Sequence, residues 1–495
     1  MEKKYLQTHM PLEDWFLLAS GGYTLELEAA RWSAIEQGHR YLREQLSQKE
    51  VTWYGVNTGF GALCDTRIEP QELELLQENL VKSHACGSGP EAKPEVVRLM
   101  LALKVHALAH GYSAVSRETV EGLLAFYNED MLPAVPVQGS LGASGDLAPL
   151  AHLTLPLLGL GFCTHQGRRL TGAEALHLMG RSPLRLGAKE GLALLNGTQF
   201  MLATGLVAMS RAKRLENTAM WASALSCEVF LASEQPFDSF IHQLRPHPGQ
   251  ISVANQLRLM WQGSALRLIP RPSVQDPYAF RCIPQVHGTS RDVLAHSGHI
   301  LSTETDAVTD NPLVDFEQGR VLSGGNFHGQ VLAMCFDHMA LALAELGSIS
   351  ERRTYQLLGG TRGLPPFLAL RSGVESGLMI VQYTAAALVS HNKQLAVPCV
   401  TDSIPSSNGQ EDHVSMGANG ANRLIPLLDN LEQILAIEWL VANRALIMRD
   451  KDPGLLLRDK TRAYLDSVPL PVGDAVWSEI LDLTRTWLHE NFPDS

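Results

Sequence analysis

The sequence predicts a mainly α-helical protein whose second half forms a bundle of long helices. Three runs of apolar residues at helical spacing, 329–358, 377–395 and 420–451, are each longer than the usual helix of a globular protein. Strand signals are sparse, and a chain of 495 residues with 45% hydrophobic and 19% charged residues is typical of a globular protein with a large core. Helices of this length are expected to pack as a bundle.

The run 420–451 shows how such a helix would be oriented. Its apolar residues recur every three or four positions, and Glu432, Glu438 and Arg444 fall outside this stripe. We therefore expect these three charged side chains to lie off the buried face. The buried stripe is predicted to consist of Ile425, Leu428, Leu431, Ile434, Leu435 and Ala442.

The first half of the chain is predicted to contain shorter elements. An amphipathic helix is expected over 25–48, a short extended piece over 51–54 and a helical pattern over 70–109. Residues 147–167 lack Lys, Arg, Asp and Glu, but prolines and glycines interrupt them. This favours a buried core segment over a membrane span.

Composition excludes several classes of function. The net charge of −12, without visible basic clusters, argues against nucleic acid as a main partner. The start of the chain, Met1-Glu2-Lys3-Lys4, leads into a polar segment, so no secretory signal is expected. The seven cysteines are far apart and form no C-x-x-C pair, which indicates free thiols in a reducing cytoplasm.

A metal site is not expected. His106 and His110 are spaced to share one helix face, but no Glu follows the first as H-E-x-x-H requires. Surface or structural histidines are the better interpretation of this pair.

The most informative stretch is the glycine-rich string 139–150. It lacks the spacing of a P-loop, of G-x-G-x-x-G and of the G-x-S-x-G nucleophile elbow. Taken alone, it predicts a turn capped by Ser144 or Asp146, with Pro149 in the first helical turn. The alternative is backbone chemistry, in which the Gly145 nitrogen attacks the Ala143 carbonyl. Loss of water would then leave Ser144 as a dehydroalanine-like alkene in a five-membered ring.

Two strings carry a specific family resemblance: Gly-Ala-Ser-Gly-Asp-Leu-Ala-Pro-Leu-Ala-His over 142–152, and Tyr-Gly-Val-Asn-Thr-Gly-Phe-Gly over 54–61. Both resemble motifs of the aromatic amino acid ammonia-lyases, which form a 4-methylidene-imidazol-5-one (MIO) electrophile from Ala-Ser-Gly. The resemblance implies a long-helix bundle of the ammonia-lyase and fumarase-like type, over 201–495. A mixed domain that bears the MIO is implied over 1–200.

Four further strings lie in the family's order along the chain: 190–199, 275–282, 323–328 and 410–417. Each alone has an ordinary interpretation, such as a helix C-cap at Asn196 or a structural ion pair. Together they extend the resemblance over nearly the whole chain.

The resemblance implies a role for each of the matching residues. It implies that Tyr54 is the base and that Asp146 assists ring formation. It also implies that Arg281 and Gln275 bind the substrate carboxylate. It also implies a homotetramer with D2 symmetry, in which three subunits build each site. The implied catalytic set is Tyr54, Ala143, Ser144, Gly145, Asn196, Tyr278, Phe327 and Glu411.

Elimination of ammonia needs a base for a weakly acidic β-proton and help for a poor leaving group. The electrophile would capture either the substrate amine or its aromatic ring. The reference pKa of tyrosine is near ~10, so Tyr54 works as a base near neutral pH only where its surroundings favour the phenolate. Nearby positive charge or the electropositive end of a helix would stabilise the phenolate of Tyr54.

The substrate is expected to be L-histidine, with trans-urocanate and ammonia as products. His84 occupies the selectivity position, and Glu411 stands where phenylalanine-selective relatives carry glutamine. A bare phenyl ring would leave both groups unpaired in a buried pocket.

Alternatives to histidine follow from the same residues. Some tyrosine-acting members also carry a histidine at this position, so tyrosine or phenylalanine with a coumarate or cinnamate product, or a 2,3-aminomutase, stays open. A catalytically silent helical scaffold is disfavoured by the intact Ala143-Ser144-Gly145 and Tyr54. Several residues depart from the pattern of the histidine-acting members: Cys86, His287, Gly329, Gln330 and the string 406–409.

Overall fold

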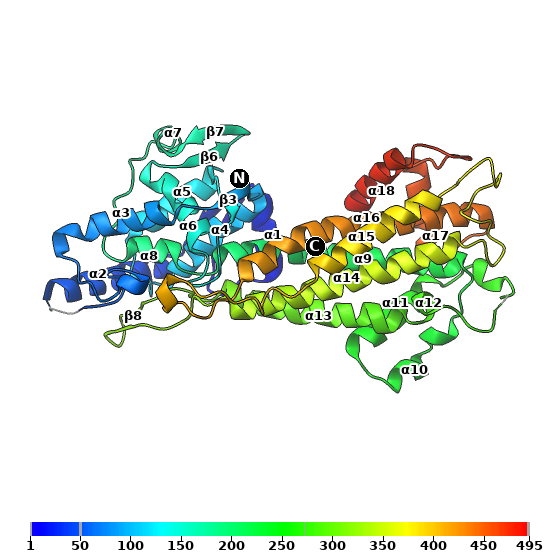
Figure 1. The fold of residues 1–495 in the computed structure, drawn as a ribbon, viewed down its shortest axis with the longest axis horizontal. Helices are drawn as coiled ribbons and strands as arrows, with labels where there is room; N and C mark the ends of the chain where they lie inside the picture. The colour runs from blue at the N-terminus through cyan, green and yellow to red at the C-terminus, as the bar shows by residue number, and fades with distance from the viewer. Residues whose placement is uncertain (1, 49–51, 272, 493–495) are drawn as a thin grey trace. The chain divides into compact units, whose positions relative to one another are not determined.

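The computed structural model describes residues 2–48, 52–271 and 273–492. The chain forms two compact units. Unit 1 comprises 1–207, 298–337 and 398–422, and unit 2 comprises 208–297, 338–397 and 423–495. The prediction of a mainly helical protein with long helices in its second half is confirmed (Figure 1). A division into domains at residue 200 stays a prediction.

Unit 1 combines helices with short strands. Its two strands nearest the N-terminus pair in parallel, with Glu2 opposite Tyr23, and the other named strand pairs are antiparallel. The strands are β1 Glu2–Tyr5, β2 Tyr23–Glu26, β3 Ser88–Glu91, β4 Leu132–Pro133, β5 Pro136–Gln138, β6 Phe162–His165, β7 Arg168–Thr171, β8 Leu313–Asp315 and β9 Arg320–Leu322. The helices that lie wholly in unit 1 are α1 Leu12–Ser20, α2 Ala29–Gln48, α3 Leu73–His84, α4 Pro94–Leu108, α5 Arg117–Asn128, α6 Leu147–Thr154, α7 Gly172–Leu178 and α8 Glu190–Leu195.

Unit 2 is helical throughout its named elements. The helices wholly within it are α10 Ser239–Gln243, α11 Pro248–Met260, α12 Tyr278–Arg281, α15 Met379–Leu395, α17 Leu455–Ser467 and α18 Trp477–Asn491. The long helices that contribute residues to both units are α9 Gln199–Val229, α13 Ile283–Thr305, α14 Gln330–Leu358 and α16 Gly417–Arg449. By length and composition α14 is apolar enough to cross a membrane, and 67% of its most apolar window is buried inside the protein.

Three predicted elements of the first half are wrong in detail. The helix expected from residue 25 begins at Ala29, because 23–26 pair as strand β2. The extended piece at 51–54 falls partly on Val51, which lies outside the described residues. The rest of that piece is irregular chain followed by a turn.

The pattern expected to be helical over 70–109 is broken between α3 and α4. Gly89 has a φ of +83°, and Pro90 and Pro94 lack the amide hydrogens that a continuous helix needs. Strand β3 occupies this break, and Pro94 begins α4. As a result α3 ends at His84, one of the candidate site residues.

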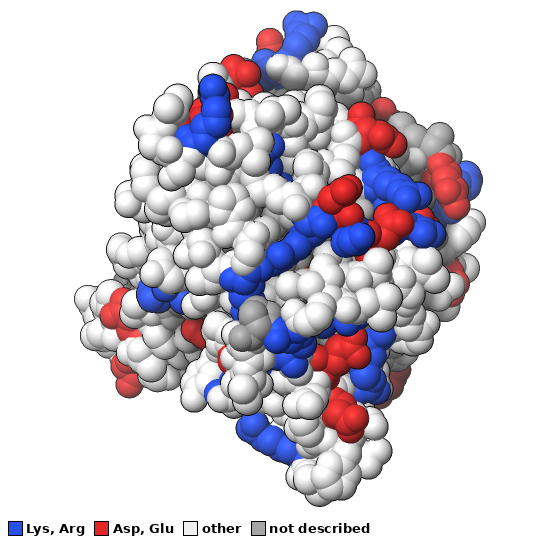
Figure 2. Space-filling view, turned by 90° about the vertical axis from the view of Figure 1, so that its right-hand side faces the viewer, with Lys and Arg blue, Asp and Glu red and all other residues white. Residues whose placement is uncertain are grey.

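Charges of both signs are mixed on the face shown in Figure 2. Lys and Arg side chains lie beside Asp and Glu side chains on that face, and neither sign covers it alone. This distribution is unlike the basic stripe that a nucleic-acid-binding surface presents.

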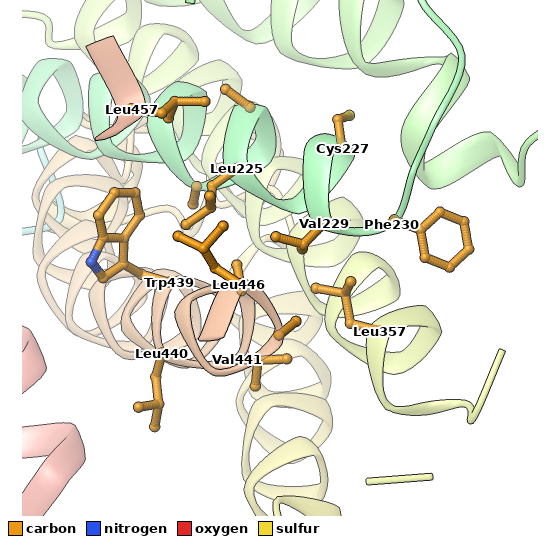
Figure 3. Packing of buried hydrophobic residues seen from close by; sticks show 14 of the residues in the cluster. Leu225, Cys227, Val229, Phe230, Leu357, Trp439, Leu440, Val441, Leu446 and Leu457 are labelled. Atoms are coloured by element: carbon orange, nitrogen blue, oxygen red, sulfur yellow. The ribbon is translucent and has the colours of Figure 1, made fainter. Parts of the chain in front are cut away.

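The core of unit 2 is formed by side chains from several helices (Figure 3). Trp439 and Leu440 of α16 are fully buried, together with Leu225 of α9 and Leu357 of α14. Each such side chain contributes about 1.5–3 kcal/mol when it leaves water. The long apolar stripes predicted from the sequence therefore meet one another in this core.

A buried ion pair interrupts this apolar core. Glu438 is fully buried rather than off the buried face as predicted, because its carboxylate accepts hydrogen bonds from the Arg353 guanidinium at 2.5 and 2.8 Å. Ser226 donates to the same carboxylate at 2.7 Å. Arg444 is also nearly buried and bonds to backbone carbonyls of Pro471 and Val472.

His287, one of the departures from the family pattern, lies beside this pair. Its Nε2 is 3.3 Å from Nη1 of Arg353, which can only donate, so the ring is neutral there. Burial lowers the pKa of His287 well below its usual value, and the charges of Arg353 and Arg291 lower it further.

We expect His287→Met to make the protein less sensitive to acid. Below pH 6.5 the unfolded histidine takes up a proton that the folded one excludes, so folding stability falls as pH drops, by about 1.4 kcal/mol per pH unit. Denaturant unfolding at pH values from 8 to 5 measures this slope. His296→Met, an exposed histidine on the same helix, is the matched control, and equal slopes in both variants would contradict the assignment.

Candidate active site

The glycine-rich string forms a tight loop that leads into α6. Gly142 and Gly145 have φ values of +68° and +74°, which favour glycine. The Ser140 hydroxyl accepts a hydrogen bond from the Gly142 nitrogen at 3.1 Å and donates to Asp146 Oδ1 at 3.1 Å. One hydroxyl thus connects the two ends of the loop.

Neither of the two expected caps holds the start of α6 through its side chain. Asp146 takes the N-cap position, but its side chain makes no capping hydrogen bond. Its second oxygen instead accepts from the Met201 backbone nitrogen at 2.9 Å. Ser144 points its hydroxyl elsewhere, so the simple capping turn does not account for these residues.

Gly145 lies directly against the backbone of Gly197. A Cβ atom added to Gly145 would lie 2.2 Å from the Gly197 carbonyl oxygen, and the Asp146 nitrogen donates to that oxygen at 2.7 Å. This contact brings the segment after α8, which begins with Asn196, against the loop.

Ser144 is held between an amide and a carboxylate. Its carbonyl oxygen accepts a hydrogen bond from Asn196 Nδ2 at 2.9 Å, and its hydroxyl donates to Glu411 Oε1 at 3.3 Å. The other carboxylate oxygen of Glu411 accepts from Ser406 at 2.8 Å. Residues separated by more than 260 positions therefore meet at this serine.

These residues line a cavity of about 740 Å³ in unit 1. One face of α3 contributes apolar and polar side chains to it, including Asn79 and Ser83. The pocket therefore gathers most of the residues that the sequence analysis singled out in unit 1. Those that line it are Tyr54, His84, Ala143, Ser144, Asn196, Phe327 and Glu411.

Tyr54 does not have the surroundings expected of a phenolate in this unit. Its hydroxyl oxygen accepts a weak hydrogen bond from the Gly61 nitrogen at 3.4 Å. Burial raises the pKa of Tyr54 above its usual value, and the Glu411 carboxylate raises it further. The neighbouring charge that acts on the phenol is thus negative, whereas a base near neutral pH needs a positive one.

His84 presents a hydrogen-bond acceptor to the cavity. Its Nδ1 lies 2.8 Å from the Leu80 carbonyl oxygen, which only accepts, so Nδ1 carries the hydrogen. Burial lowers the pKa of His84, which favours the neutral ring. The remaining nitrogen, Nε2, then has a free lone pair and accepts from a donor.

Asp146 is fully buried beneath the loop. Burial raises its pKa to about 7, although the Met201 nitrogen and the Ser140 hydroxyl both act to lower it. A carboxyl group with this pKa exchanges a proton near neutral pH.

The remaining candidate residues lie in unit 2 and do not line this cavity. Tyr278 is 70% exposed at the start of α12, and the Arg281 guanidinium lies 4.3 Å from its ring centre. The Arg281 Nε has no hydrogen-bond partner among the described residues. Gln275 lines a second hollow of about 420 Å³ beside Asp276, whose carboxylate pairs with Arg362 at 2.7 Å.

No group of three or more His, Cys, Asp and Glu side chains gathers as metal ligands would within 2–48, 52–271 and 273–492. His106 instead packs edge-on against Trp15 and His110, and its Nε2 lies 3.4 Å from Asp306. The His106 and His110 pair is therefore part of the packing of unit 1.

A family model described as aromatic amino acid lyase matches residues 10–468. The chain belongs to the aromatic amino acid lyase family. It is 47% identical over 450 residues to the histidine ammonia-lyase of Symbiobacterium thermophilum, covering 90% of this chain and 88% of that protein.

Solved structures of aromatic amino acid lyases and their relatives have the same fold. The histidine ammonia-lyase from Trypanosoma cruzi superposes with a TM-score of 0.90 at 37% identity, covering 99% of this chain and 94% of that one. The tyrosine aminomutase from Streptomyces globisporus superposes with a TM-score of 0.92 at 33% identity, covering 99% and 97%. The fold is thus shared by lyases and aminomutases.

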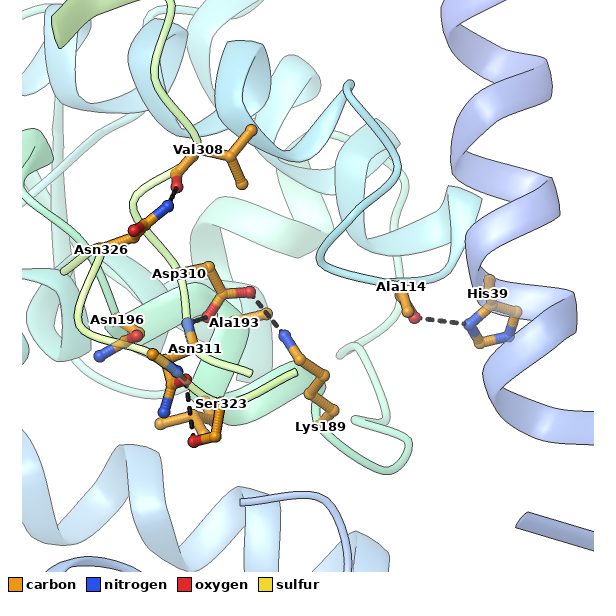
Figure 4. A network of polar contacts seen from close by, with 12 residues as sticks. His39, Ala114, Lys189, Ala193, Asn196, Val308, Asp310, Asn311, Ser323 and Asn326 are labelled. Atoms are coloured by element: carbon orange, nitrogen blue, oxygen red, sulfur yellow. Dashed lines mark hydrogen bonds and ion pairs between the residues drawn. The ribbon is translucent and has the colours of Figure 1, made fainter. Parts of the chain in front are cut away.

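Sequence reasoning missed several residues that shape this lyase-family site. Ser140 was hidden in a run of small residues, and Asn311 in an ordinary loop. The Asn311 side chain accepts from Ser323 at 3.1 Å and from the Gly324 nitrogen at 2.7 Å, which holds one wall of the cavity (Figure 4). Lys104 was also missed, although it is the one Lys, Arg, Asp or Glu between Arg98 and Arg117.

We expect Gly145→Ala to destabilise the protein much more than Gly180→Ala. Both glycines have positive φ values, +74° and +65°, so both variants carry the cost of a left-handed residue, about 1–2 kcal/mol. Only at Gly145 does the new methyl group meet backbone, because nothing lies within 4 Å of a Cβ at Gly180. The midpoints of denaturant unfolding compare the two variants. Equal losses would show that the contact with Gly197 does not require glycine.

Proposed function

We propose that this chain eliminates ammonia from L-histidine to give trans-urocanate. The observation that carries the proposal is the position of Ser144 between Asn196 and Glu411, in a cavity that Tyr54 and His84 also line. The 47% identity to a protein named histidine ammonia-lyase supports the choice of substrate.

Ala143, Ser144 and Gly145 fit an MIO group formed from the chain itself. Gly145 has no Cβ to obstruct its nitrogen, and Asn196 already donates to the carbonyl oxygen that would belong to the ring. Glu411 accepts the hydrogen of the Ser144 hydroxyl, the group that ring formation removes. The MIO would supply an electron-poor alkene that accepts electrons from the substrate. We propose no metal ion.

Two carboxyl groups support this loop in different ways. Asp146, with a pKa of about 7, holds or releases a proton beside Gly145 as water is lost. Glu411 lies in the open cavity, where its carboxylate is placed to contact the ammonium group of an amino acid, so the choice between an imidazole and a phenyl ring depends on His84.

Tyr54 takes the β-proton in this proposal, and it needs a cation to do so. Its pKa is raised within unit 1, and a guanidinium near the phenol would lower it. We propose that Arg281 of the partner subunit approaches this site in a homotetramer and also holds the substrate carboxylate with the partner's Gln275. The Arg281 Nε without a hydrogen-bond partner and the exposed Tyr278 support this assembly.

His84 selects substrates that can donate a hydrogen bond. Its Nε2 accepts from an imidazole N–H, whereas a phenyl ring would leave it unpaired. A tyrosine hydroxyl also donates, so tyrosine is the second candidate substrate, and the similarity to a tyrosine aminomutase supports keeping a 2,3-aminomutase as the second reaction.

The compartment we propose is the cytoplasm. Within the described residues, no disulfide bond joins any of the seven cysteines, as expected in a reducing environment, and three of them are buried. The net charge of −12 supports small molecules rather than nucleic acids as partners.

Purified protein is expected to convert L-histidine, and not L-phenylalanine, into an unsaturated acid that absorbs in the ultraviolet. Its intact mass should be lower by two waters, because ring formation removes them. Ser144→Ala should abolish turnover and keep the full mass, with an unchanged far-ultraviolet helical signal as the folding control. Turnover of tyrosine without histidine would overturn the substrate, and full mass in active protein would overturn the MIO assignment.

We expect His84→Leu to invert the order of substrates. Without the Nε2 acceptor, kcat/KM for histidine should fall about tenfold or more, since its N–H becomes an unpaired buried donor. Activity on phenylalanine, which the parent protein is expected to lack, should appear, because the phenyl ring then meets an apolar side chain. Steady-state kinetics with both amino acids measure the ratio, and an unchanged ratio would remove His84 from substrate selection.

A further inference from the structure

Lys104 is a cation in the middle of an apolar helix. Its side chain is 2% exposed, and its neighbours in α4 from Leu99 to Leu108 are all buried. Burying an ammonium group costs several kcal/mol unless it is paired or hydrogen-bonded. Its position therefore demands specific partners.

Those partners are backbone carbonyls beside the reacting loop. The Lys104 ammonium donates to the Asn196 carbonyl oxygen at 2.7 Å and to the Ala193 carbonyl oxygen at 3.2 Å. Helix α8 ends at Leu195, and Gly197 turns the chain away with a φ of +126°, so carbonyls at this end lack helical N–H donors. Lys104 supplies the missing donors from another helix.

Asn196 has little else to fix its side chain. Nδ2 donates to the Ser144 carbonyl oxygen at 2.9 Å, whereas Oδ1 is buried and has no hydrogen-bond partner among the described residues. The direction of the amide therefore depends on where the backbone of Asn196 is held, and Lys104 is the side chain that holds its carbonyl.

A second buried lysine in the same unit has a different partner. The Lys189 ammonium pairs with Asp310 at 2.5 Å, and Figure 4 shows this pair beside Ala193 and Asn196. Asp310 is thus occupied by Lys189, and Lys104 is directed to the carbonyls. Burial lowers the pKa of Lys104 to about 7, while the more distant charges of Asp310 and Asp146 act to raise it.

We propose that Lys104 is a positioning residue that acts through Asn196: its ammonium fixes the Asn196 backbone so that the amide donates to the Ser144 carbonyl oxygen. The inference rests on the proposed function for its kinetic consequence, but its geometric content stands apart from any activity. Lys104 contacts neither the cavity nor the substrate in this arrangement.

The kinetic test is a double-mutant cycle of Lys104→Met with Asn196→Ala, assayed with histidine. Lys104→Met removes the ammonium and keeps the stem, and it should lower kcat about tenfold to a hundredfold with a smaller change in KM. In the Asn196→Ala background it should have no further effect on kcat, because the residue it positions is gone. Effects that multiply in the double variant would overturn the proposal.

Lys189→Met is the matched control for the loss of a buried lysine. Its partner is Asp310 and not Asn196, so its effect on kcat should multiply with that of Asn196→Ala. If Lys104→Met does not fold, Lys104→Gln is compared directly with the parent: its amide can still donate to the Asn196 carbonyl oxygen, so kcat near that of the parent is expected, and a loss as large as that of Asn196→Ala would overturn the proposal. Lys104→Gln should retain more kcat than Lys104→Met where both fold, and equal kcat in the two variants would overturn the proposal.

A crystal structure of Lys104→Met tests the geometry without any assay of turnover. The contact between Asn196 Nδ2 and the Ser144 carbonyl oxygen, or the ring oxygen derived from it, should open beyond hydrogen-bond distance. A contact kept near 2.9 Å would overturn the positioning role. If the parent protein acts on no amino acid, only the proposed function is overturned. The distance from Asn196 Nδ2 to the Ser144 carbonyl oxygen still tests the role of Lys104.

Discussion

The close contact between the backbones at Gly145 and Gly197 is the constraint on which the site depends. A Cβ at Gly145 would collide with the backbone of Gly197, and Gly197 itself has a φ of +126° that favours glycine, so the loop packs closely against the end of α8. This contact brings the Asn196 amide to Ser144, and the hydroxyl of Ser140 ties the loop to Asp146. Backbone packing therefore places Asn196 beside Ser144 before any ligand arrives.

Three buried charged groups in the described part of the chain are paired or hydrogen-bonded. Lys104 donates to carbonyls, Lys189 pairs with Asp310, and in unit 2 Glu438 pairs with Arg353. Removing one partner from such a group costs more than the pair itself contributes, because the other is left unpaired in a poorly solvated place. These groups therefore specify how helices and loops meet.

Much of the fold was predictable because it follows from local patterns. The long helices α14 and α16 were found from apolar spacing alone, since 3.6-residue periodicity survives over eight turns. The break between α3 and α4 was not predicted, although Pro90 and Pro94 indicate it. The prediction for Glu438 was wrong because its partner Arg353 is 85 residues away. An ion pair between residues so far apart in sequence cannot be recognised from the apolar periodicity of one helix.

The candidate site residues that lie in family motifs could be predicted from the sequence. The properties that depend on burial in three dimensions could not. Ser144 and Tyr54 stand in strings specific enough to name a family. The pKa of Tyr54 depends on burial and on Glu411, some 350 residues later, and Lys104 acts on carbonyls about 90 residues away. A lone lysine among apolar residues is the signal of Lys104 in the sequence.

The return of the chain to unit 1 has a consequence for the order of events during synthesis. The cavity is lined by residues from Tyr54 to His413, and the carboxylate that meets Ser144 belongs to Glu411. A ribosome that has completed residues 1–207 has made the glycine-rich loop that holds Ser144, but not Glu411. Ser144 therefore reaches its final surroundings only after residue 411 has been made.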